Sequence, residues 1–370
     1  MNRRVQLFFA SLCLLVSTLS AMSQQTASSD WESWLKTLPP VPEFAIPDAT
    51  SDWQKQKAKT RKTLWKLLGQ LPPRPKQPNV KTLSREDRGD FFVEKFVFDN
   101  GAGAEVPGYL LLPKTKRKKS PAILYCHWHG GQYDIGKEEM FQTNATPVAP
   151  GPELARNGFV VLAIDAYCFG ERNGRGPGGP SEKGGAGEMT ASKFHLWAGR
   201  SLWGMMLRDD LMALDYLASR PEVDARRIGV TGISMGATRT WWLMALDQRL
   251  KAGTAVCCLT RYQDLISIEG LKYHGIYYFV PGMLAHFDSE AVVSIIAPRP
   301  LLVMNGDRDA GSPVSGIRAI EKKCEAAYGL EGKPENFKSE IFPETGHVYL
   351  PAMWDQTLAW LKRHLQSSPK

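Results

Sequence analysis

Residues 232–236 read Gly-Ile-Ser-Met-Gly, which places a serine between two glycines where an apolar run meets a helical pattern. The pattern predicts a strand just before this segment and a helix that opens at Ala237. Two glycines allow a tight turn beside a strained serine, whose hydroxyl then projects above a sheet. The amino end of the helix adds positive potential where negative charge would develop. Ser234 is therefore predicted to be a catalytic nucleophile, with an ordinary strand-to-helix turn as the alternative.

A serine nucleophile needs a base to take its proton and a carboxylate to orient that base. In enzymes with this kind of turn the acid follows the serine along the chain, and the histidine follows the acid. Asp309 lies in a loop after an expected strand and is the predicted acid. Asp307 is the alternative acid, and otherwise it would form a turn by bonding nearby backbone amides. His347 leaves the last expected strand and is the predicted base.

A His-Trp-His-Gly-Gly segment at 127–131 follows another expected strand. At that place a backbone amide can point at the oxyanion of a tetrahedral intermediate, with the amide of Met235 as its partner. Gly131 is the predicted donor of this segment, and Gln132 is the nearest alternative. The two histidines resemble a metal-binding pair, but no third ligand is suggested, so no metal site is expected. His129 is expected to fix the loop by hydrogen bonding.

Strands that alternate with helices would position these residues. Eight strands are expected, at 91–98, 108–112, 122–128, 160–166, 228–233, 254–259, 301–305 and 339–342, with helices near 150–157, 201–219, 235–248, 313–328 and 352–366. This alternation indicates an α/β fold with a mainly parallel sheet and helices on both faces. The short connections between the first strands indicate an antiparallel start.

Two insertions interrupt this alternation, at 168–200 and 260–297. Long loops in compact domains are often functional, and the first insertion is glycine-rich and expected to be a flexible loop. Arg172, His195 and Trp197 are its candidate substrate-binding residues, which would bind an acidic sugar or another anionic group. A surface ion network is the equally consistent alternative. Aromatic residues of the second insertion would stack on sugar rings or belong to the core.

The amino-terminal region predicts an exported protein. A basic start, an apolar run at 5–19 and small residues before residue 24 are typical of a signal peptide, here 1–23. An uncleaved anchor is the alternative, although the run is short for a membrane span. Residues 24–90 are predicted to form an extension with an amphipathic helix at 51–69 and a Pro-rich linker at 71–78. Residues 91–370 would be the catalytic domain, in a secreted or periplasmic protein.

Charge and cysteine content narrow the function classes. The formal net charge is +8, but the basic residues are scattered apart from a run at 114–119, which is expected to be a hairpin tip rather than a nucleic-acid site. The cysteines that remain after cleavage are odd in number, and their spacing matches neither a disulfide framework nor a zinc site. One disulfide is conceivable. No cofactor is indicated, and the sequence leaves the oligomeric state open.

Several segments resemble a known family. They are 67–72 (Leu-Leu-Gly-Gln-Leu-Pro), 106–113 (Val-Pro-Gly-Tyr-Leu-Leu-Leu-Pro), 162–172 (Leu-Ala-Ile-Asp-Ala-Tyr-Cys-Phe-Gly-Glu-Arg), the serine turn, 305–309 and 346–347. Over about residues 60–366 the chain resembles the bacterial α/β-hydrolases related to dienelactone hydrolase and acetyl xylan esterase. The resemblance implies an α/β-hydrolase fold and a carboxylic-ester hydrolase without a cofactor, often active on acetylated sugars. Dienelactone hydrolases proper use a cysteine where this chain has Ser234.

The expected function is that of a secreted serine esterase that deacetylates a carbohydrate or another small ester through an acyl-enzyme. A glucuronoyl methylesterase is one alternative, because the cationic first insertion would suit its substrate. A peptidase of the prolyl-oligopeptidase type is another, but such enzymes usually carry an amino-terminal propeller for which this chain has no room. A non-catalytic binding protein on the same fold is the alternative of another class.

Overall fold

The computed structural model describes residues 33–34, 37–115 and 117–366. The predicted signal peptide at 1–23 lies outside these residues. The chain divides into two compact units, Met1–Pro40 and Val41–Lys370. In the first unit, the hydroxyl of Thr37 donates to the carbonyl of Trp34 at 2.7 Å. Among the described helices, none combines the length and hydrophobicity that crossing a membrane requires.

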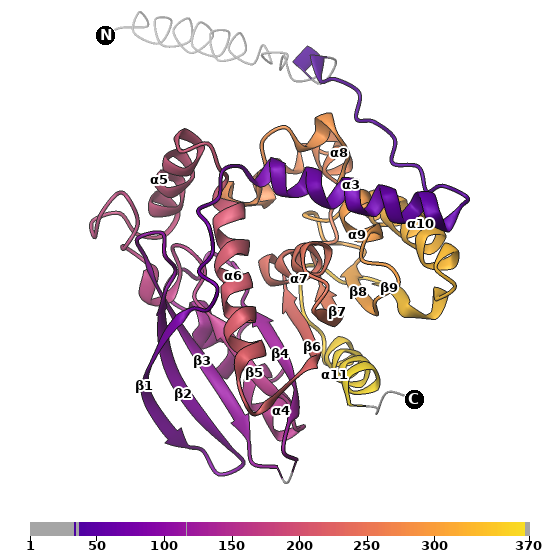
Figure 1. Cartoon of the computed structure of the whole chain (residues 1–370). Helices are drawn as coiled ribbons and strands as arrows, with labels where there is room; N and C mark the ends of the chain where they lie inside the picture. Colours follow the sequence, from indigo (N-terminus) through magenta and orange to yellow (C-terminus); the bar gives the residue numbers. More distant parts are fainter. Residues whose placement is uncertain (1–32, 35–36, 116, 367–370) are drawn as a thin grey trace, which may run out of the picture. The chain divides into compact units, whose positions relative to one another are not determined.

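One mixed sheet organises the second unit (Figure 1). Within the described residues it has nine strands in the order β1-β2-β3-β5-β4-β6-β7-β8-β9. The pairings β1–β2, β2–β3 and β3–β5 are antiparallel, and all the others are parallel. The strands are β1 (Asn79–Asp87), β2 (Phe91–Asp99), β3 (Glu105–Pro113), β4 (Ser120–Cys126), β5 (Val160–Ile164), β6 (Val223–Ile233), β7 (Leu250–Val256), β8 (Leu301–Gly306) and β9 (Phe337–Phe342). The predicted antiparallel start and parallel remainder are confirmed.

The expected number of eight strands is one too few, because the sequence pattern misses β1. All seven residues of β1 after Val80 are exposed, and most of them are polar or charged. No apolar alternation therefore marks the strand. It forms because its backbone pairs with β2 along its whole length, from Asn79 opposite Asp99 to Asp87 opposite Phe92. Charged side chains on an edge strand are a common protection against edge-to-edge association.

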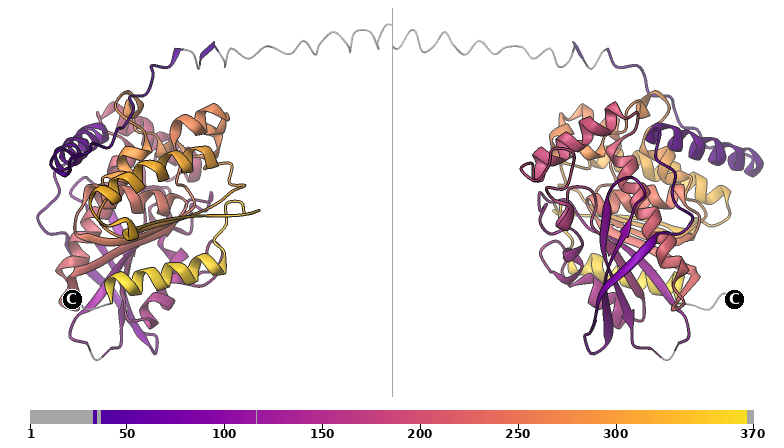
Figure 2. Two further views of the ribbon diagram at one scale, coloured as in Figure 1. Left: turned by 90° about the vertical axis from the view of Figure 1, so that its right-hand side faces the viewer. Right: turned by 60° about the vertical axis from the view of Figure 1, so that its left-hand side comes forward.

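The two faces of the sheet bury separate hydrophobic clusters, because successive side chains of a strand point to opposite faces. Leu124 and Cys126 of β4 belong to one cluster, whereas Ile123 and Tyr125 belong to the other. On the first face lie α6 (Leu202–Ser219), α7 (Met235–Leu246) and α10 (Val314–Leu330), and on the second lie α4 (Pro150–Arg156) and α11 (Pro351–Leu365) (Figure 2). The predicted two-sided helical cover is confirmed.

The predicted amphipathic helix is α3 (Thr50–Leu68), which packs into the core of the second unit. Trp53, Leu64 and Leu68 are fully buried at helical spacing, and the helix contacts α7 and α9 (Ser289–Ser294). The Pro-rich stretch after it is also held against the second unit, because the guanidinium of Arg208 donates hydrogen bonds to two of its backbone carbonyls at 2.7 Å each. The helix and the sheet therefore belong to one compact unit, and the boundary expected after residue 90 does not separate two units.

The first insertion contains a regular helix where a flexible loop was expected. The helix α5 (Gly184–Trp197) has 14 residues, and Glu188, Ala191 and His195 are buried along one side of it. Glycines at its start weaken its intrinsic propensity, so the helix depends on burial of this side against α6 and η4 (Ile276–Tyr278). The second insertion consists of short elements, which are α8 (Tyr262–Ser267), η3 (Gly270–Tyr273), η4, η5 (Met283–Ala285) and α9. Two of its tyrosines, Tyr277 and Tyr278, are buried, as the core alternative predicts.

Candidate active site

Ser234 occupies a strained turn between β6 and α7. Its φ is 58°, in the left-handed region that residues other than glycine rarely adopt. The flanking glycines are required by the close approach of β4 to this turn. A Cβ atom at Gly232 would lie 2.3 Å from the carbonyl oxygen of Cys126, and one at Gly236 would lie 2.0 Å from the same oxygen. The sequence motif thus reflects backbone crowding, and the hydroxyl-bearing residue stands where the parallel strands end.

Asp309 and His347 are hydrogen-bonded to each other. The Nδ1 atom of His347 lies 2.7 Å from Oδ2 of Asp309, and the other carboxylate oxygen accepts the amide of Gly311 at 2.9 Å. Asp309 is buried, whereas the side chain of His347 is about one-third exposed, at 35%. Asp307 instead accepts the backbone amide of Thr345 at 3.1 Å. Of the two candidate acids, Asp309 contacts the histidine and Asp307 ties the two loops together.

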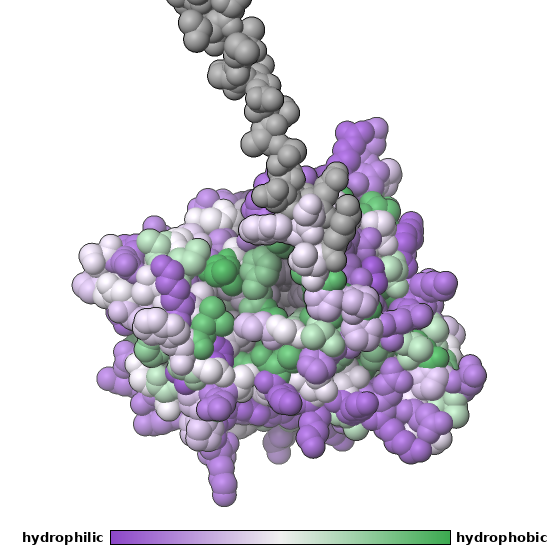
Figure 3. Space-filling view, turned by 90° about the horizontal axis from the view of Figure 1, so that it is seen from above, coloured by the Kyte–Doolittle hydropathy of each residue, from purple (hydrophilic) through white to green (hydrophobic). Residues whose placement is uncertain are grey.

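Ser234, Asp309 and His347 line one pocket of about 590 Å³. The surface is hollowed on the side where α5 and α8 lie, and hydrophobic side chains border the hollow (Figure 3). The rest of the lining comes from the loop after β4, from the second insertion and from the loop after β8, and consists of His129, Gly130, Gly131, Cys258, Lys272, Tyr273, His274, Gly275, Tyr277, Arg308, Ala310 and Gly311. The turn at the end of β6 therefore supplies Ser234, and the connections supply most of the walls.

The amides near Ser234 are arranged differently from the prediction. Gly131 lines the pocket, but its N–H donates to Nδ1 of His129 at 3.1 Å, and the N–H of Gln132 donates to the carbonyl of His129 at 2.8 Å. Within this fully described loop the amides of His129 and Gly130 have no hydrogen-bond partner. Met235 opens α7, where amides lack partners within the helix. The amide of Gly131, the predicted donor, is therefore already bonded, and the unpaired amides near Ser234 are those of His129, Gly130 and Met235.

Two buried groups hold the loop after β4 in place. The carboxylate of Glu139 accepts the amide of Trp128 at 2.7 Å and the hydroxyl of Tyr125. Burial raises the pKa of Glu139 to about 7, and these hydrogen bonds oppose that rise. His127 accepts the amide of Ala166 at its Nε2 atom, at 3.1 Å, and donates from Nδ1 to the carbonyl of Trp128 at 2.7 Å. Burial lowers the pKa of His127 well below its usual range, so it is neutral and both ring nitrogens are occupied.

Comparison with known proteins identifies the family. The model of the Abhydrolase family matches residues 23–347, which is most of the chain. The chain belongs to the Abhydrolase family. It is 36% identical over 311 residues to the Bacillus subtilis (strain 168) protein named "Putative hydrolase YtaP", which covers 84% of this chain and 100% of that protein.

Solved structures of low identity share the α/β-hydrolase fold of this Abhydrolase family member. The glucuronoyl esterase from Solibacter usitatus has a TM-score of 0.63 at 17% identity, covering 88% of this chain and 99% of that one. Acetyl xylan esterase 1 from Thermoanaerobacterium sp. JW/SL YS485 has a TM-score of 0.57 at 18% identity, covering 88% and 100%. At these identities the likeness is one of fold, and the expected fold class is confirmed.

Two cysteines of this Abhydrolase chain lie close to Ser234, and the sequence did not reveal this proximity. Cys257 and Cys258 follow β7 with φ values of 62° and 58°, and Sγ of Cys258 lies 3.9 Å from Oγ of Ser234. Burial raises the pKa of both thiols, so they stay protonated. Metal-ligating atoms of Cys257, Asp309 and His347 lie within 4.8 Å of one another. Two of these groups already bind each other and the third is a protonated thiol, which is a poor set of metal ligands.

All the described cysteines are buried and unpaired, so the conceivable disulfide is not formed among them. A further residue missed in the sequence is His274, whose Nε2 atom donates to the carbonyl of Gly311 at 2.9 Å. Burial lowers its pKa, and its ring stacks on Tyr278 at 4.3 Å between centroids. It lines the pocket, and its place in an aromatic-rich insertion was the available signal.

The structure brings none of the three predicted substrate-binding residues into this pocket. Arg172 is buried, with its Nη1 atom 3.0 Å from Oδ2 of Asp209. His195 is also buried and accepts a hydrogen bond from Arg200 at 3.2 Å, and burial lowers its pKa to about 4. Trp197 is 98% exposed at the end of α5. The ion-network alternative describes Arg172 better than substrate binding does, because its charge is neutralised inside the protein.

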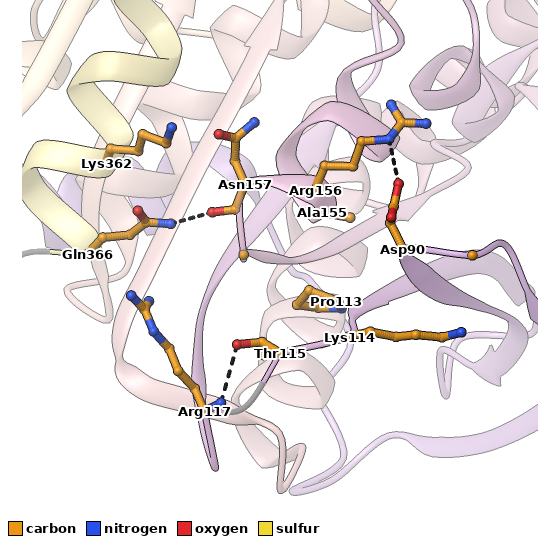
Figure 4. A pocket seen from close by; sticks show the side chains of 12 residues that line it. Asp90, Pro113, Lys114, Thr115, Arg117, Ala155, Arg156, Asn157, Lys362 and Gln366 are labelled. Carbon is orange, nitrogen blue, oxygen red and sulfur yellow. Dashed lines mark hydrogen bonds and ion pairs between the residues drawn. The ribbon is translucent and has the colours of Figure 1, made fainter.

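A second cavity of about 1020 Å³ lies away from Ser234, against α4 and α11 (Figure 4). Its cationic lining includes Lys114, Arg117, Arg156 and Lys362, and Asp90 lies 3.2 Å from Arg156. The lining contains no serine, cysteine or histidine. Its described lining therefore offers no serine or cysteine paired with a histidine, in contrast to the pocket at Ser234.

Proposed function

We propose that this Abhydrolase family member is a serine esterase that hydrolyses a carboxylic ester through an acyl-enzyme at Ser234. The observation that carries the proposal is the 2.7 Å bond between His347 and Asp309 in the pocket that Ser234 also lines. This bond leaves Nε2 of His347 as the basic nitrogen, because a carboxylate at Nδ1 holds the proton there. The strained backbone of Ser234 supports the same proposal, since strain of this kind is concentrated at functional sites.

The reaction proceeds in two steps. In the first, His347 takes the proton of Ser234, the serine oxygen attacks the ester carbonyl, and the protonated histidine returns the proton to the departing alcohol. In the second, His347 takes a proton from water, the hydroxide attacks the acyl-enzyme, and the acid leaves as the serine is reprotonated. The amides of Met235 and of His129 or Gly130 would stabilise the negative oxygen in both steps.

The substrate class is proposed to be a small ester, with an acetylated sugar as the first candidate. An ester of an acidic sugar is the second candidate, and the charge of the pocket lining favours it. Lys272 and Arg308 line the pocket, whereas its one carboxylate, that of Asp309, is bound to His347. Lys272 makes no ion pair within the described chain. Arg308 pairs with Glu344 at 3.0 Å, so a substrate carboxylate near the ester would meet unopposed positive charge at Lys272.

The site of action is proposed to be outside the cytoplasmic membrane, in the periplasm or the medium. The support is the basic, apolar and small-residue order of residues 1–23. Amino-terminal sequencing of the exported protein tests this, and we expect cleavage just before Gln24. An amino terminus at Met1 would refute export by cleavage.

Hydrolysis of p-nitrophenyl acetate by the protein and by Ser234→Ala tests the esterase. We expect turnover by the wild type and a loss on the order of 10³-fold or more in the variant. Ser267→Ala is the matched control, because this exposed serine bonds only a local carbonyl, that of Asp264. Labelling by a fluorophosphonate separates an enzyme from a binding protein, since only an activated serine reacts. Equal activity of wild type and Ser234→Ala would refute the assignment.

The two substrate candidates are separated by one comparison. Rates are measured on an acetylated neutral sugar and on the same ester with a free carboxylate nearby, for the wild type and for Lys272→Ala. Preference for the acidic ester that is lost in Lys272→Ala supports the second candidate. A preference for the neutral sugar, unchanged in the variant, supports the first.

A further inference from the structure

The ring of His129 is the point at which both insertions meet the loop beside the nucleophile. It stacks on Tyr277 of the second insertion, with centroids 5.0 Å apart and planes 21° apart. The edges of Tyr133 and Phe169 pack against it at 5.0 and 5.1 Å. The side chain is only 17% exposed. Its position is therefore set by residues that come from three separate parts of the chain.

The hydrogen bonds of this ring define its protonation. Because Nδ1 accepts the amide of Gly131, at 3.1 Å, the ring proton must be on Nε2. That atom lies 3.3 Å from Oε1 of Glu188, but the two are not aligned as a hydrogen bond, and neither atom has a hydrogen-bond partner in the described chain. The other carboxylate oxygen of Glu188 accepts the hydroxyl of Tyr133 at 3.2 Å. A buried donor and a buried acceptor thus lie close together without another partner, and their attraction is that of a polar N–H for a nearby carboxylate.

The carboxylate of Glu188 is placed there by α5, and its exposed fraction is 2%. A buried carboxylate is costly unless its oxygens meet donors. Here the hydroxyl of Tyr133 donates to one oxygen, and the ring N–H of His129 lies 3.3 Å from the other. The first insertion therefore reaches the loop beside Ser234 through Phe169 and Glu188, although its predicted substrate-binding residues do not.

We propose that Glu188 is a positioning residue for the oxyanion loop, acting through His129. The proposal rests on the proposed esterase function. Gly130 and Gly131 have φ values of 48° and 70°, and glycines in such a loop have many other conformations available. The carboxylate fixes the ring, the ring holds the amide of Gly131, and this bond selects the loop conformation in which the amides of His129 and Gly130 remain unpaired.

The effect on catalysis follows from the position of the loop. An oxyanion donor stabilises the transition state only when it points at the developing charge, and misplacement by 1 Å costs about 10²-fold in rate. Loss of Glu188 frees the ring and the loop, while the walls of the pocket stay. The expected result is a lower kcat with KM little changed, which differs from the loss of a substrate contact.

The experiment compares Glu188→Ala, Glu188→Gln, His129→Ala and the double variant on p-nitrophenyl acetate. Glu188→Gln is the conservative variant, because its amide oxygen keeps an acceptor beside the ring of His129 while its NH₂ donates to the hydroxyl of Tyr133. Ser192→Ala is the matched control on α5, since this buried serine has no hydrogen-bond partner in the described chain. Thermal midpoints of all variants verify that each is folded.

We expect kcat to fall by about 10- to 100-fold in Glu188→Ala, with KM within about threefold. Glu188→Gln restores most of the rate, and Ser192→Ala matches the wild type. The double variant is no slower than His129→Ala alone, because the two residues act through one path. Nitrogen-15 NMR of labelled histidine reports a ring with unprotonated Nδ1 in the wild type.

Three results would overturn the proposal. They are a folded Glu188→Ala with wild-type kcat, a double variant whose loss equals the product of the single losses, and a wild-type ring that carries its proton on Nδ1. An inactive wild type would instead refute the esterase function, and with it the catalytic role of Glu188. The wild-type rate therefore distinguishes failure of the proposed function from failure of this inference.

Discussion

Gly236→Ala is the perturbation that tests most directly how the fold holds the nucleophile. The added Cβ would lie 2.0 Å from the carbonyl oxygen of Cys126 and 2.9 Å from the carbonyl carbon. Real Cβ atoms essentially never approach another atom this closely, so something must shift. The obstructing atoms are backbone at the end of β4, which cannot rotate away as a flexible side chain would. The turn at Ser234 and the end of β4 must therefore separate by about 1.5 Å to reach ordinary contact distances near 3.5 Å.

Two magnitudes follow from this displacement. Forcing an extra carbon into a packed interior costs about 1–3 kcal/mol, which lowers the thermal midpoint of a domain this large by a few degrees. A 1 Å misplacement of the reacting group costs about 10²-fold in rate. We expect kcat/KM of Gly236→Ala on p-nitrophenyl acetate to fall by at least that factor, while the protein remains folded at 25 °C.

Gly329→Ala is the matched control for the same substitution. Gly329 lies near the end of α10, and nothing lies within 4 Å of the position that its Cβ would take. Alanine should stabilise this helix by about 0.5–1 kcal/mol, with no change in rate. Wild-type kcat/KM in Gly236→Ala would refute the claim that contact with β4 positions Ser234. A rate loss shared by both variants would show that the assay reports stability rather than this contact.

Other predictions concern the acid, the loop anchor and the amino-terminal helix. Asp309→Asn should lower kcat by about 10³- to 10⁴-fold, whereas Asp307→Asn should change it little; steady-state rates decide, and equal losses would contradict the assignment. Burial raises the pKa of Glu139 to about 7, above its value in the unfolded chain. The stability of the wild type relative to Glu139→Gln is therefore greatest in acid and declines as the pH rises through about 7. Urea unfolding at pH 5 and pH 8.5 measures this change, and a pH-independent difference would refute it. Trp53→Ala should cost about 3–5 kcal/mol in the same assay, because Trp53 is fully buried; a cost below about 1 kcal/mol would mean that α3 adds little to the fold.

Much of the fold could be predicted because its signals are local. The eight strands β2 to β9 and the helices α6, α7, α10 and α11 carry the apolar patterns from which they could be predicted. The edge strand β1 carries no such signal, since its stability comes from backbone pairing with β2. The helix α5 begins in glycines, and only its buried side against α6 and η4 explains why it forms. Tertiary contacts of this kind are absent from a local pattern.

The candidate site likewise has residues that the sequence could predict and contacts that it could not. Ser234, Asp309 and His347 were predicted because each follows a strand whose position the pattern indicates. The amide of Gly131 is taken by the ring of His129, and this bond depends on side-chain orientation within the loop. Arg172 looked available for a substrate, but its partner Asp209 is 37 residues away in the chain. Long-range pairing of a charge cannot be deduced from its neighbours in sequence.

The strained residues explain how these parts work together. Ser234, Cys257 and Cys258 all have positive φ, and they lie where β6 and β7 end side by side. Such conformations cost about 1–3 kcal/mol each and persist only when the surrounding structure holds them. The buried sheet provides that support, because Ser234 donates its amide to Val256 and Cys257 donates its amide to Met304. Lys272 and Arg308, by contrast, lie exposed on connections, and neither has a positive φ. Substitutions on those connections can therefore change which ester is accepted at little cost in stability, whereas substitutions behind the nucleophile change rate and stability together.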